Sequence, residues 1–266
     1  MTTEELKMPV SLHYVAFPSL HEVPLTIAGR LRVPSGEGKK PAVLLLHGTA
    51  GPSAREGGYA DGLNAAGFVT LELDQWAARG STGGVAGRPK TVLETLPDVY
   101  GARAYLAAHA AVDASRIGVM GFSFGGIASM LAATHLRNDV FLKGDHFKAH
   151  MPFYPIGWAY NKVPGFEFGD LVDAPVMIVT GALDQYDNDP HVMEKLVATL
   201  DARDAAKITL KVMDNSHHCF DMPGADVVVN DPFSHQGKGG EVTMRCNEAA
   251  MADAHQLVVK FFSDVM

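Results

Sequence analysis

The sequence predicts an α/β protein, built as a doubly wound, mostly parallel sheet with helices on both faces and no large lid domain. Three observations predict this fold class. Short apolar runs alternate with stretches of helical periodicity, several runs are apolar at every position, and the runs end at Gly, Asp, Pro or Asn. Strands that alternate with helices form parallel sheets, and strands buried on both faces are continuously apolar.

Seven strands are expected along the chain. The first, residues 25–33 (LTIAGRLRV), ends at Pro34-Ser35-Gly36 and is expected to be an antiparallel edge strand followed by its turn. The second, residues 41–46 (PAVLLL), is a continuous apolar run, so we expect it to be buried on both faces. The remaining strands are expected at 68–73, 116–120, 149–153, 175–180 and 208–213.

Helical spacing of apolar residues predicts the segments between these strands. Helices are expected at 59–66, 96–109, 125–137, 190–200 and 244–262. Two segments, 157–173 and 221–240, are rich in Gly, Pro and aromatic residues and do not fit the alternation. Because ligands bind at the carboxyl ends of the strands in such folds, we expect these two segments to form walls of a pocket there.

Length and composition indicate one globular domain. The chain of 266 residues is 47% hydrophobic and 20% charged, unlike disordered, collagen-like or coiled-coil sequences. No internal repeat or long linker divides it. Residues 1–266 are therefore expected to form a single domain, in which 1–24 are an N-terminal extension or edge region.

Charge and cysteine content restrict the partners and the compartment. The formal net charge is −8 and the basic residues are scattered, which argues against nucleic-acid and membrane binding. The expected partner is a small-molecule substrate, and the protein is expected to be a monomer or homodimer. The only two cysteines, Cys219 and Cys246, cannot form a C-x-x-C motif, and we expect free thiols. The start MTTEELKMPV lacks the order of a signal peptide, so a cytoplasmic location is expected.

The strongest chemical motif is Gly121-Phe122-Ser123-Phe124-Gly125, between an apolar strand and a helical stretch. This is G-x-S-x-G in the strand–turn–helix context of a nucleophile elbow. The turn is so tight that side chains two residues to either side of the serine would collide, which explains the glycines. Ser123 is therefore the expected nucleophile, and the Phe124 N–H is an expected oxyanion donor.

A serine nucleophile needs a base and an orienting acid, which follow it in the order acid, then histidine, in this kind of fold. Asp184 comes just after the strand at 175–180 and is the expected acid, with Asp187 and Asp189 as competitors. After the last strand, the base is expected to be one of two adjacent histidines, His217 and His218.

Two further features concern the same strand ends. The loop after the second strand, His47-Gly48-Thr49-Ala50-Gly51, is small enough to approach a substrate carbonyl, so the N–H of Thr49, or secondarily of Ala50, is the second expected oxyanion donor. A zinc site at residues 217–219 is the competing interpretation of the histidine pair. Consecutive residues rarely converge on one ion, and no metal or other cofactor is expected.

These motifs resemble the dienelactone hydrolase-type branch of the α/β-hydrolase superfamily. The resemblance rests on PAVLLLHG, DASRIGVMGFSFGG, PVMIVTGALD and the residues from His218 to Asp221, and covers roughly residues 25–264. It implies an α/β-hydrolase fold and hydrolysis of an ester, lactone or thioester without a cofactor. It also implies His218 as the base, since in relatives a small residue and then Phe follow the catalytic histidine.

The resemblance includes two departures and suggests the substrate contacts. The type enzymes carry cysteine where Ser123 stands. Arg79 matches the place of an arginine that binds a substrate carboxylate, whereas Asp221 stands where a second arginine is expected. Aromatic residues near strand ends are expected to line the pocket, namely Trp76, Phe124, Phe153, Trp158 and Tyr160; of these, Trp76, Trp158 and Tyr160 are expected to bind substrate together with Arg79.

The expected function is therefore that of a serine hydrolase acting on a small or medium ester, lactone or thioester through an acyl-enzyme. A peptidase or transacylase with the same triad is the alternative enzyme. A catalytically silent hydrolase fold that binds a ligand is the alternative from another class, since a fold does not fix a function.

Overall fold

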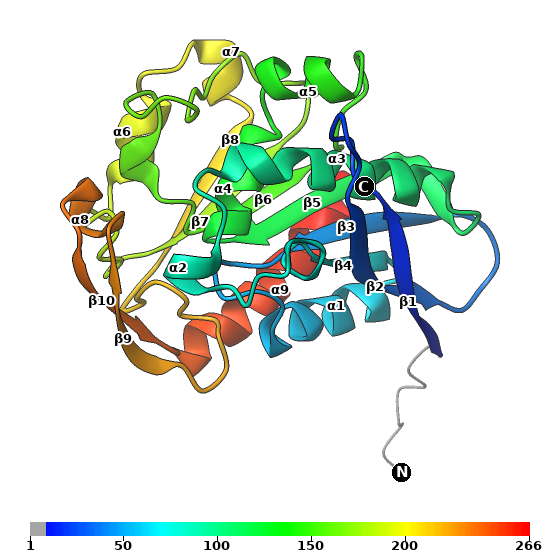
Figure 1. Ribbon diagram of the computed structural model, residues 1–266, viewed down its shortest axis with the longest axis horizontal. Coiled ribbons are helices and arrows are strands. Elements are labelled where there is room, and N and C mark those ends of the chain that lie inside the picture. Colours follow the sequence, from blue (N-terminus) through cyan, green and yellow to red (C-terminus); the bar gives the residue numbers. More distant parts are fainter. Residues whose placement is uncertain (1–8) are drawn as a thin grey trace.

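The computed structural model describes residues 9–266, and an eight-stranded sheet runs through the middle of the molecule (Figure 1). The strand order is β1-β2-β4-β3-β5-β6-β7-β8. β1 pairs with β2, and β2 with β4, in antiparallel fashion, whereas all other neighbours are parallel. The strands are β1 (Val10–Pro18), β2 (Thr26–Pro34), β3 (Lys40–Leu46), β4 (Val69–Asp74), β5 (Val112–Phe122), β6 (His150–Phe153), β7 (Val176–Gly181) and β8 (Ile208–Met213).

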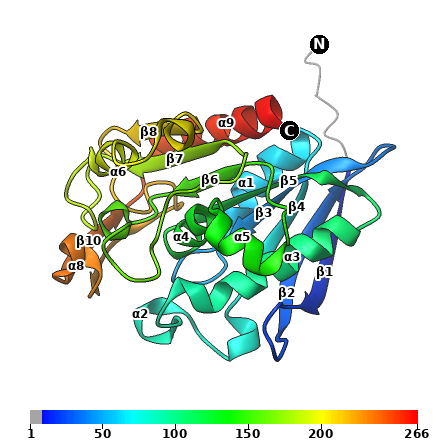
Figure 2. The ribbon, with the colours of Figure 1, turned by 90° about the horizontal axis from the view of Figure 1, so that it is seen from above.

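Helices cover both faces of this sheet. Figure 2 shows α1 and α9 on one face and α3, α4 and α5 on the other. The helices are α1 (Ala54–Ala65), α2 (Gly84–Gly87), α3 (Leu96–Ala108), α4 (Phe124–Leu131), α5 (His135–Phe141), α6 (Val192–Val197), α7 (Ala202–Ala205), α8 (Ser234–Gly237) and α9 (Glu248–Val265), with 3₁₀ turns at Ala77–Arg79, Val92–Thr95 and Gly157–Ala159. The predicted fold class, a mostly parallel sheet wound on both sides without a large lid domain, is confirmed.

Side chains of the central strands alternate between two apolar cores. On β3, Val43 and Leu45 pack with the core that contains α1 and α9, whereas Leu44 and Leu46 pack with the core that contains α3 and α4. All four are fully buried. Successive side chains of a strand point to opposite faces, so a strand covered on both sides must be apolar throughout.

Three expectations about the elements are corrected. The strand expected at 25–33 is antiparallel, but it is not at the edge, because β1 pairs along its whole length and the region 1–24 therefore supplies the true edge strand. The helix expected at 125–137 is two helices, because the helical conformation is interrupted at residues 132–134, where Thr134 forms an antiparallel β-bridge with Leu171. The last helix begins at Glu248 rather than at 244.

The segment 221–240, which the sequence sets apart, begins a separate two-stranded hairpin. β9 (Asp226–Asp231) pairs antiparallel with β10 (Gly240–Arg245), and α8 lies between them. Figure 1 shows this hairpin at the end of the molecule far from β1. Among residues 9–266, no helix has both the length and the apolar character needed to cross a membrane.

Candidate active site

Ser123 lies on a sharp turn between β5 and α4. Its φ of 52° is in the left-handed region, and its side chain is 8% exposed. The flanking glycines have no room for a side chain, since a Cβ on Gly121 would overlap the Gly125 carbonyl and one on Gly125 would lie 2.6 Å from the His47 oxygen. The strained turn thus needs glycine at these positions, and it holds the serine hydroxyl at the N-terminus of α4.

Ser123, His218 and Asp184 form one hydrogen-bonded chain. The His218 Nε2 atom lies 2.9 Å from Ser123 Oγ, and His218 Nδ1 lies 2.7 Å from Asp184 Oδ2. The imidazole of His218 is fully buried and Asp184 is 6% exposed. Since a carboxylate only accepts hydrogen bonds, Nδ1 carries the proton and Nε2 is left to accept from the serine hydroxyl.

The competing acids and the second histidine are not members of this hydrogen-bonded chain. Asp187 accepts the N–H groups of Gly157 and Trp158 and so fixes the 3₁₀ turn there. Burial and the neighbouring Asp184 carboxylate raise the pKa of Asp187. Asp189 pairs with Lys195 at the surface. His217 lines a different pocket from Ser123, together with residues of the loop after β7. Residues 9–266 contain no group of three or more His, Cys, Asp or Glu side chains placed to hold a metal ion.

Tyrosines enclose the His218 ring. The rings of Tyr154 and Tyr186 lie 4.6 and 4.3 Å from it, centroid to centroid. The Tyr186 N–H also donates to Asp184 Oδ1 at 2.9 Å. These contacts fix the orientation of the imidazole and of the carboxylate behind it.

A buried polar network lies behind these rings. Asp221 is fully buried and accepts hydrogen bonds from the hydroxyls of Tyr154 (2.5 Å) and Tyr59 (2.7 Å). Burial and the Asp221 carboxylate raise the pKa of both hydroxyls, so each stays a donor. Arg55 Nη1 donates to the Tyr154 oxygen at 2.9 Å. Burial raises the pKa of the Cys219 thiol to about 12, so this thiol, next to the base, stays protonated.

The loop after β3 faces Ser123. A Cβ on Gly48 would lie 3.7 Å from the Ser123 Cβ, so this loop approaches the serine closely. The Thr49 carbonyl accepts from the Trp76 indole at 3.0 Å and from the Gly84 N–H at 2.9 Å. Burial lowers the pKa of His47, and the neutral ring joins the Gln75 N–H to the Gly48 carbonyl. The loop is therefore held by several hydrogen bonds.

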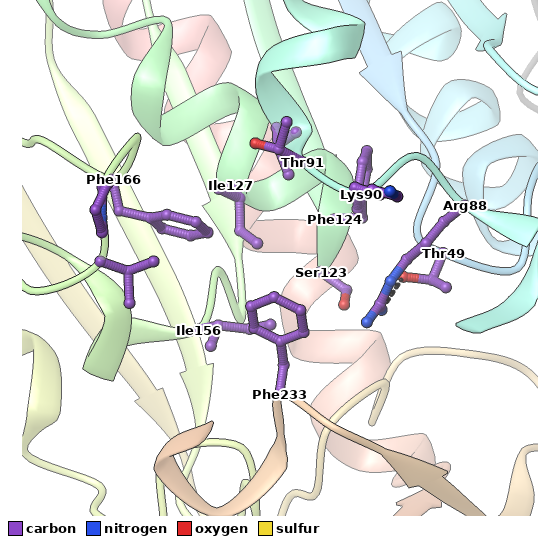
Figure 3. Close-up of a pocket in the computed structure, with 13 residues that line it drawn as sticks. Thr49, Arg88, Lys90, Thr91, Ser123, Phe124, Ile127, Ile156, Phe166 and Phe233 are labelled. Carbon is purple, nitrogen blue, oxygen red and sulfur yellow. Dashed lines mark hydrogen bonds between the residues drawn. The ribbon is translucent and has the colours of Figure 1, made fainter. Parts of the chain in front are cut away.

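A cavity of about 150 Å³ opens at Ser123 (Figure 3). Thr49, Phe124 and Ser123 all line it, so the two residues expected to supply oxyanion donors and the serine share one space. As the first residue of α4, Phe124 has no acceptor for its N–H within the helix. The apolar wall consists of Val92, Ile127, Ile156, Val163, Pro164, Phe166 and Phe233.

One side of the cavity is charged. Arg88, which follows α2, points into the space beside Ser123 (Figure 3). Its guanidinium binds Asp231 in bidentate fashion, at 2.9 and 3.0 Å, and donates to Thr49 Oγ1 at 3.2 Å. The Tyr186 hydroxyl donates to the same carboxylate at 3.0 Å. The ion pair joins the end of β9 to the loop after β4, and the hydrogen bond to Thr49 connects both to the loop after β3.

The four expected substrate-binding residues do not line this cavity. Arg79 pairs with the buried Asp98 and binds the carbonyls of Gln75 and Glu94. The other three side chains have structural partners: Trp76 holds the Thr49 carbonyl, Trp158 donates to the Phe233 carbonyl, and Tyr160 donates to the Pro155 carbonyl. Phe153, also expected at the pocket, is fully buried in the core. The expected position of these five residues at the pocket is therefore corrected: in this structure none of them lines the cavity at Ser123.

Sequence reasoning did not find Arg88, Asp231 and Tyr186. Arg88 lies in the glycine-rich loop that follows β4, and Asp231 lies in the segment 221–240 that was expected to form a pocket wall. The usable signal for Asp231 was its place in that segment. The pairing of Arg88 with Asp231 gave no such signal, because 143 positions separate them in the sequence.

Comparisons with known proteins identify a family for the chain. The profile described as the dienelactone hydrolase family matches residues 27–266. None of the curated protein sequences matches this chain.

Solved structures resemble the chain over nearly its whole length. The dienelactone hydrolase-like promiscuous phosphotriesterase P91, from metagenomic libraries, is 18% identical with a TM-score of 0.70, over 96% of this chain and 98% of that one. Dienelactone hydrolase from Anabaena variabilis is 19% identical with a TM-score of 0.62, over 97% and 99%. Thermogutta terrifontis esterase 2, phosphorylated by paraoxon, is 14% identical with a TM-score of 0.65, over 100% and 98%. At these identities the likeness is one of fold.

Proposed function

The chain belongs to the dienelactone hydrolase family, a family of α/β-hydrolases, and from this premise we propose that it is a serine hydrolase that cleaves a carboxylic ester, lactone or thioester. One observation carries the proposal. The Ser123 hydroxyl, the His218 imidazole and the Asp184 carboxylate form a hydrogen-bonded chain, and its serine end opens into a cavity. This is the arrangement that activates a serine for acyl transfer.

The first half of the reaction forms an acyl-enzyme. Ser123 Oγ attacks the carbonyl carbon while its proton passes to His218 Nε2, and Asp184 stabilises the imidazolium that results. The negative charge moves to the carbonyl oxygen. The N–H groups of Phe124 and Thr49 are proposed to receive it, since both residues border the cavity at Ser123.

The remaining steps complete the acyl-enzyme and then hydrolyse it to release the acid. His218 gives its proton to the leaving oxygen or sulfur, and the tetrahedral intermediate collapses to an ester on Ser123. Water then attacks this ester with His218 again as the base, and the free serine and the carboxylic acid are formed. No step in this sequence requires a cofactor.

The cavity supports a small or medium substrate. About 150 Å³ accommodates a compact acyl or aryl group, and the wall opposite the charged side is apolar.

We propose that residues 1–266 act as one domain, as a monomer or homodimer, without nucleic-acid or membrane partners. The two cysteines are free thiols, one of them buried, and this supports the proposed cytoplasmic location.

The decisive experiment is to replace the nucleophile. Ser123→Ala is expected to lower kcat for a short 4-nitrophenyl ester by about 10⁴-fold or more, because the remaining groups provide no nucleophile. A fluorophosphonate probe is expected to label the native protein at Ser123 and to leave the variant unlabelled. Release of 4-nitrophenol and mass spectrometry of the labelled peptide measure the two effects.

The matched control is Ser129→Ala, in the same helix as the elbow. Ser129 is buried and its hydroxyl lies 3.4 Å from the Val119 carbonyl, away from the cavity. This variant is expected to keep the native turnover and labelling. Undiminished turnover in Ser123→Ala would refute the proposed nucleophile, and a native protein that neither turns over esters nor takes the probe would refute the proposed function.

A further inference from the structure

The cavity at Ser123 holds one partly buried cation, and the protein neutralises it from behind. The Arg88 side chain lines the cavity and is 12% exposed. Asp231, its bidentate partner, is 1% exposed and does not line the cavity. The Arg88 guanidinium therefore faces the cavity, whereas the Asp231 carboxylate that balances its charge is buried behind it.

Asp231 is built to remain charged. Its Oδ1 atom accepts the Phe233 N–H at 2.8 Å, and its Oδ2 atom accepts the Tyr186 hydroxyl at 3.0 Å. Burial alone would raise the pKa of Asp231, but the hydrogen bonds from Arg88 and Phe233 lower it below its usual value. At neutral pH the pair is thus an ionised carboxylate on an ionised guanidinium.

The rest of the cavity offers no second buried cation within the described residues. Lys90 is the other basic residue of the lining, and its side chain is exposed at the rim, where water and salt screen it. The Phe233 ring lies 5.4 Å from the guanidinium carbon of Arg88 and covers one face of the cation. The guanidinium makes no hydrogen bond within residues 9–266 beyond those to Asp231 and Thr49, so its Nε–H and one Nη2–H remain free to donate.

From this arrangement we propose that Asp231 is a specificity-determining residue that sets the cavity for uncharged esters. The proposal rests on the proposed esterase function. Arg88 donates hydrogen bonds to a neutral acceptor of the substrate, such as a second ester, an amide or an ether oxygen. Asp231 cancels the net charge that would otherwise attract a substrate carboxylate.

The physical reason is the balance of charge in a small, mostly apolar space. A substrate carboxylate entering the cavity would lose its hydration and would meet a guanidinium whose attraction is offset by Asp231. A neutral acceptor loses far less hydration and still receives the free N–H donors. Removing the charge of Asp231 without changing the size of the side chain should therefore shift the preference toward the anionic ester.

The test compares two esters that differ by one charge. Methyl 4-acetoxybenzoate is neutral, and 4-acetoxybenzoate carries a carboxylate; in both, the released phenol is followed by its absorbance. The native protein is expected to have the higher kcat/KM for the neutral ester. In Asp231→Asn, the anionic-to-neutral ratio of kcat/KM is expected to rise about tenfold, because Arg88 then carries an uncompensated charge. Any general loss of activity cancels in this ratio.

Asp226→Asn is the matched control. Asp226 is at the other end of β9, is exposed, and pairs with Arg245. Its replacement changes the net charge of the same hairpin by the same amount, and the ratio is expected to stay at the native value. An unchanged ratio in Asp231→Asn, an equal rise in Asp226→Asn, or a native preference for the anionic ester would each overturn the proposal.

A second measurement separates this proposal from the proposed function. Calorimetric titration of the two esters into Ser123→Ala, with and without Asp231→Asn, measures the charge preference without turnover. Tighter binding of the neutral ester, with a preference that shifts toward the anionic ester in Asp231→Asn, supports the specificity role even if the native protein hydrolyses neither ester. The same preference in both backgrounds overturns it.

Discussion

At residue 123 the backbone stores strain that its neighbours must accommodate. A serine at φ 52° costs about 1–3 kcal/mol unless the surroundings enforce it. Here the enforcing contacts come from the end of β3, whose carbonyls at Leu46 and His47 lie against Gly125. The glycine thus serves two purposes: it admits the turn, and it lets the loop that carries Thr49 approach Ser123.

Gly125→Ala tests this double role. The added methyl would overlap the Leu46 carbonyl and lie 2.6 Å from the His47 oxygen, so the end of β3 must shift. We expect the free energy of unfolding to fall by about 2 kcal/mol or more, and kcat for a 4-nitrophenyl ester to fall with it. Urea unfolding and initial rates measure both.

Gly62→Ala, in α1, is the control for this substitution. Its Cβ would approach only one methyl group, Val259 Cγ2, at 3.3 Å and no backbone atom, so we expect a change within about 1 kcal/mol of the native value. Equal urea midpoints for native protein and Gly125→Ala would show that the turn tolerates a methyl.

At the residue scale, the sequence predicts the triad residues better than it predicts which side chains line the pocket. Ser123, Asp184 and the pair His217–His218 could be picked out because each lies in the turn or loop after a strand, and parallel strands bring their ends to one edge. Only the family resemblance selected His218 from the pair. Trp76 and Trp158 also follow strands or loops near that edge, yet their side chains turn to backbone carbonyls. Side-chain direction depends on tertiary packing, which residue order does not specify.

Among the elements, α1 brings a buried ion pair beneath the site. Arg55 and Glu56, in its first turn, are both 2% exposed and lie 2.7 Å apart. Glu56 also closes a capping box with Ser53, which places an acidic residue where the helix dipole favours it. Through Tyr154, Arg55 connects this helix to the residues behind His218.

Arg55→Met measures how much this pair contributes. The substitution keeps the length of the side chain but leaves Glu56 charged and buried and the Tyr154 oxygen without its donor. We expect the free energy of unfolding to fall by about 3–5 kcal/mol. Arg245→Met breaks the exposed pair with Asp226 and is expected to cost less than about 1 kcal/mol. Similar losses in the two variants, measured in urea, would mean that burial of the Arg55 pair has no special importance.

The elements themselves were predictable where both faces are buried. The apolar run at 41–46 becomes β3, which is buried on both faces. The run at 208–213 becomes β8 with unchanged bounds, although β8 is an edge strand whose residues alternate between exposed and partly buried positions. β1 was missed because most of its side chains are exposed, Tyr14 by 84%, so no buried face marks it. The α4–α5 break was missed because the apolar spacing continues across it, while the pairing of Thr134 with Leu171 ends the helix.

At the scale of the whole molecule, an apolar core covers each face of the sheet. A titratable side chain buried in either core is shielded from water, which disfavours its charged form. His150 is fully buried on β6, with Nδ1 3.1 Å from the Ser129 carbonyl. A carbonyl only accepts, so Nδ1 carries the proton, and Nε2 has no partner among residues 9–266. Burial lowers the pKa of His150 to about 3.

This burial makes the stability of the molecule depend on pH. Below about pH 6.5 the unfolded chain protonates His150 whereas the folded protein does not, so stability is lost as the pH falls toward 3, by about 1.4 kcal/mol per pH unit. Between pH 7 and 5, His150→Asn should therefore lose about 2 kcal/mol less free energy of unfolding than the native protein, since the amide can still donate to Ser129 without titrating. Urea titrations at both pH values measure this. His13→Asn, at an exposed position on β1, should keep the native loss; the same loss in His150→Asn would mean that the buried imidazole does accept a proton in the folded state.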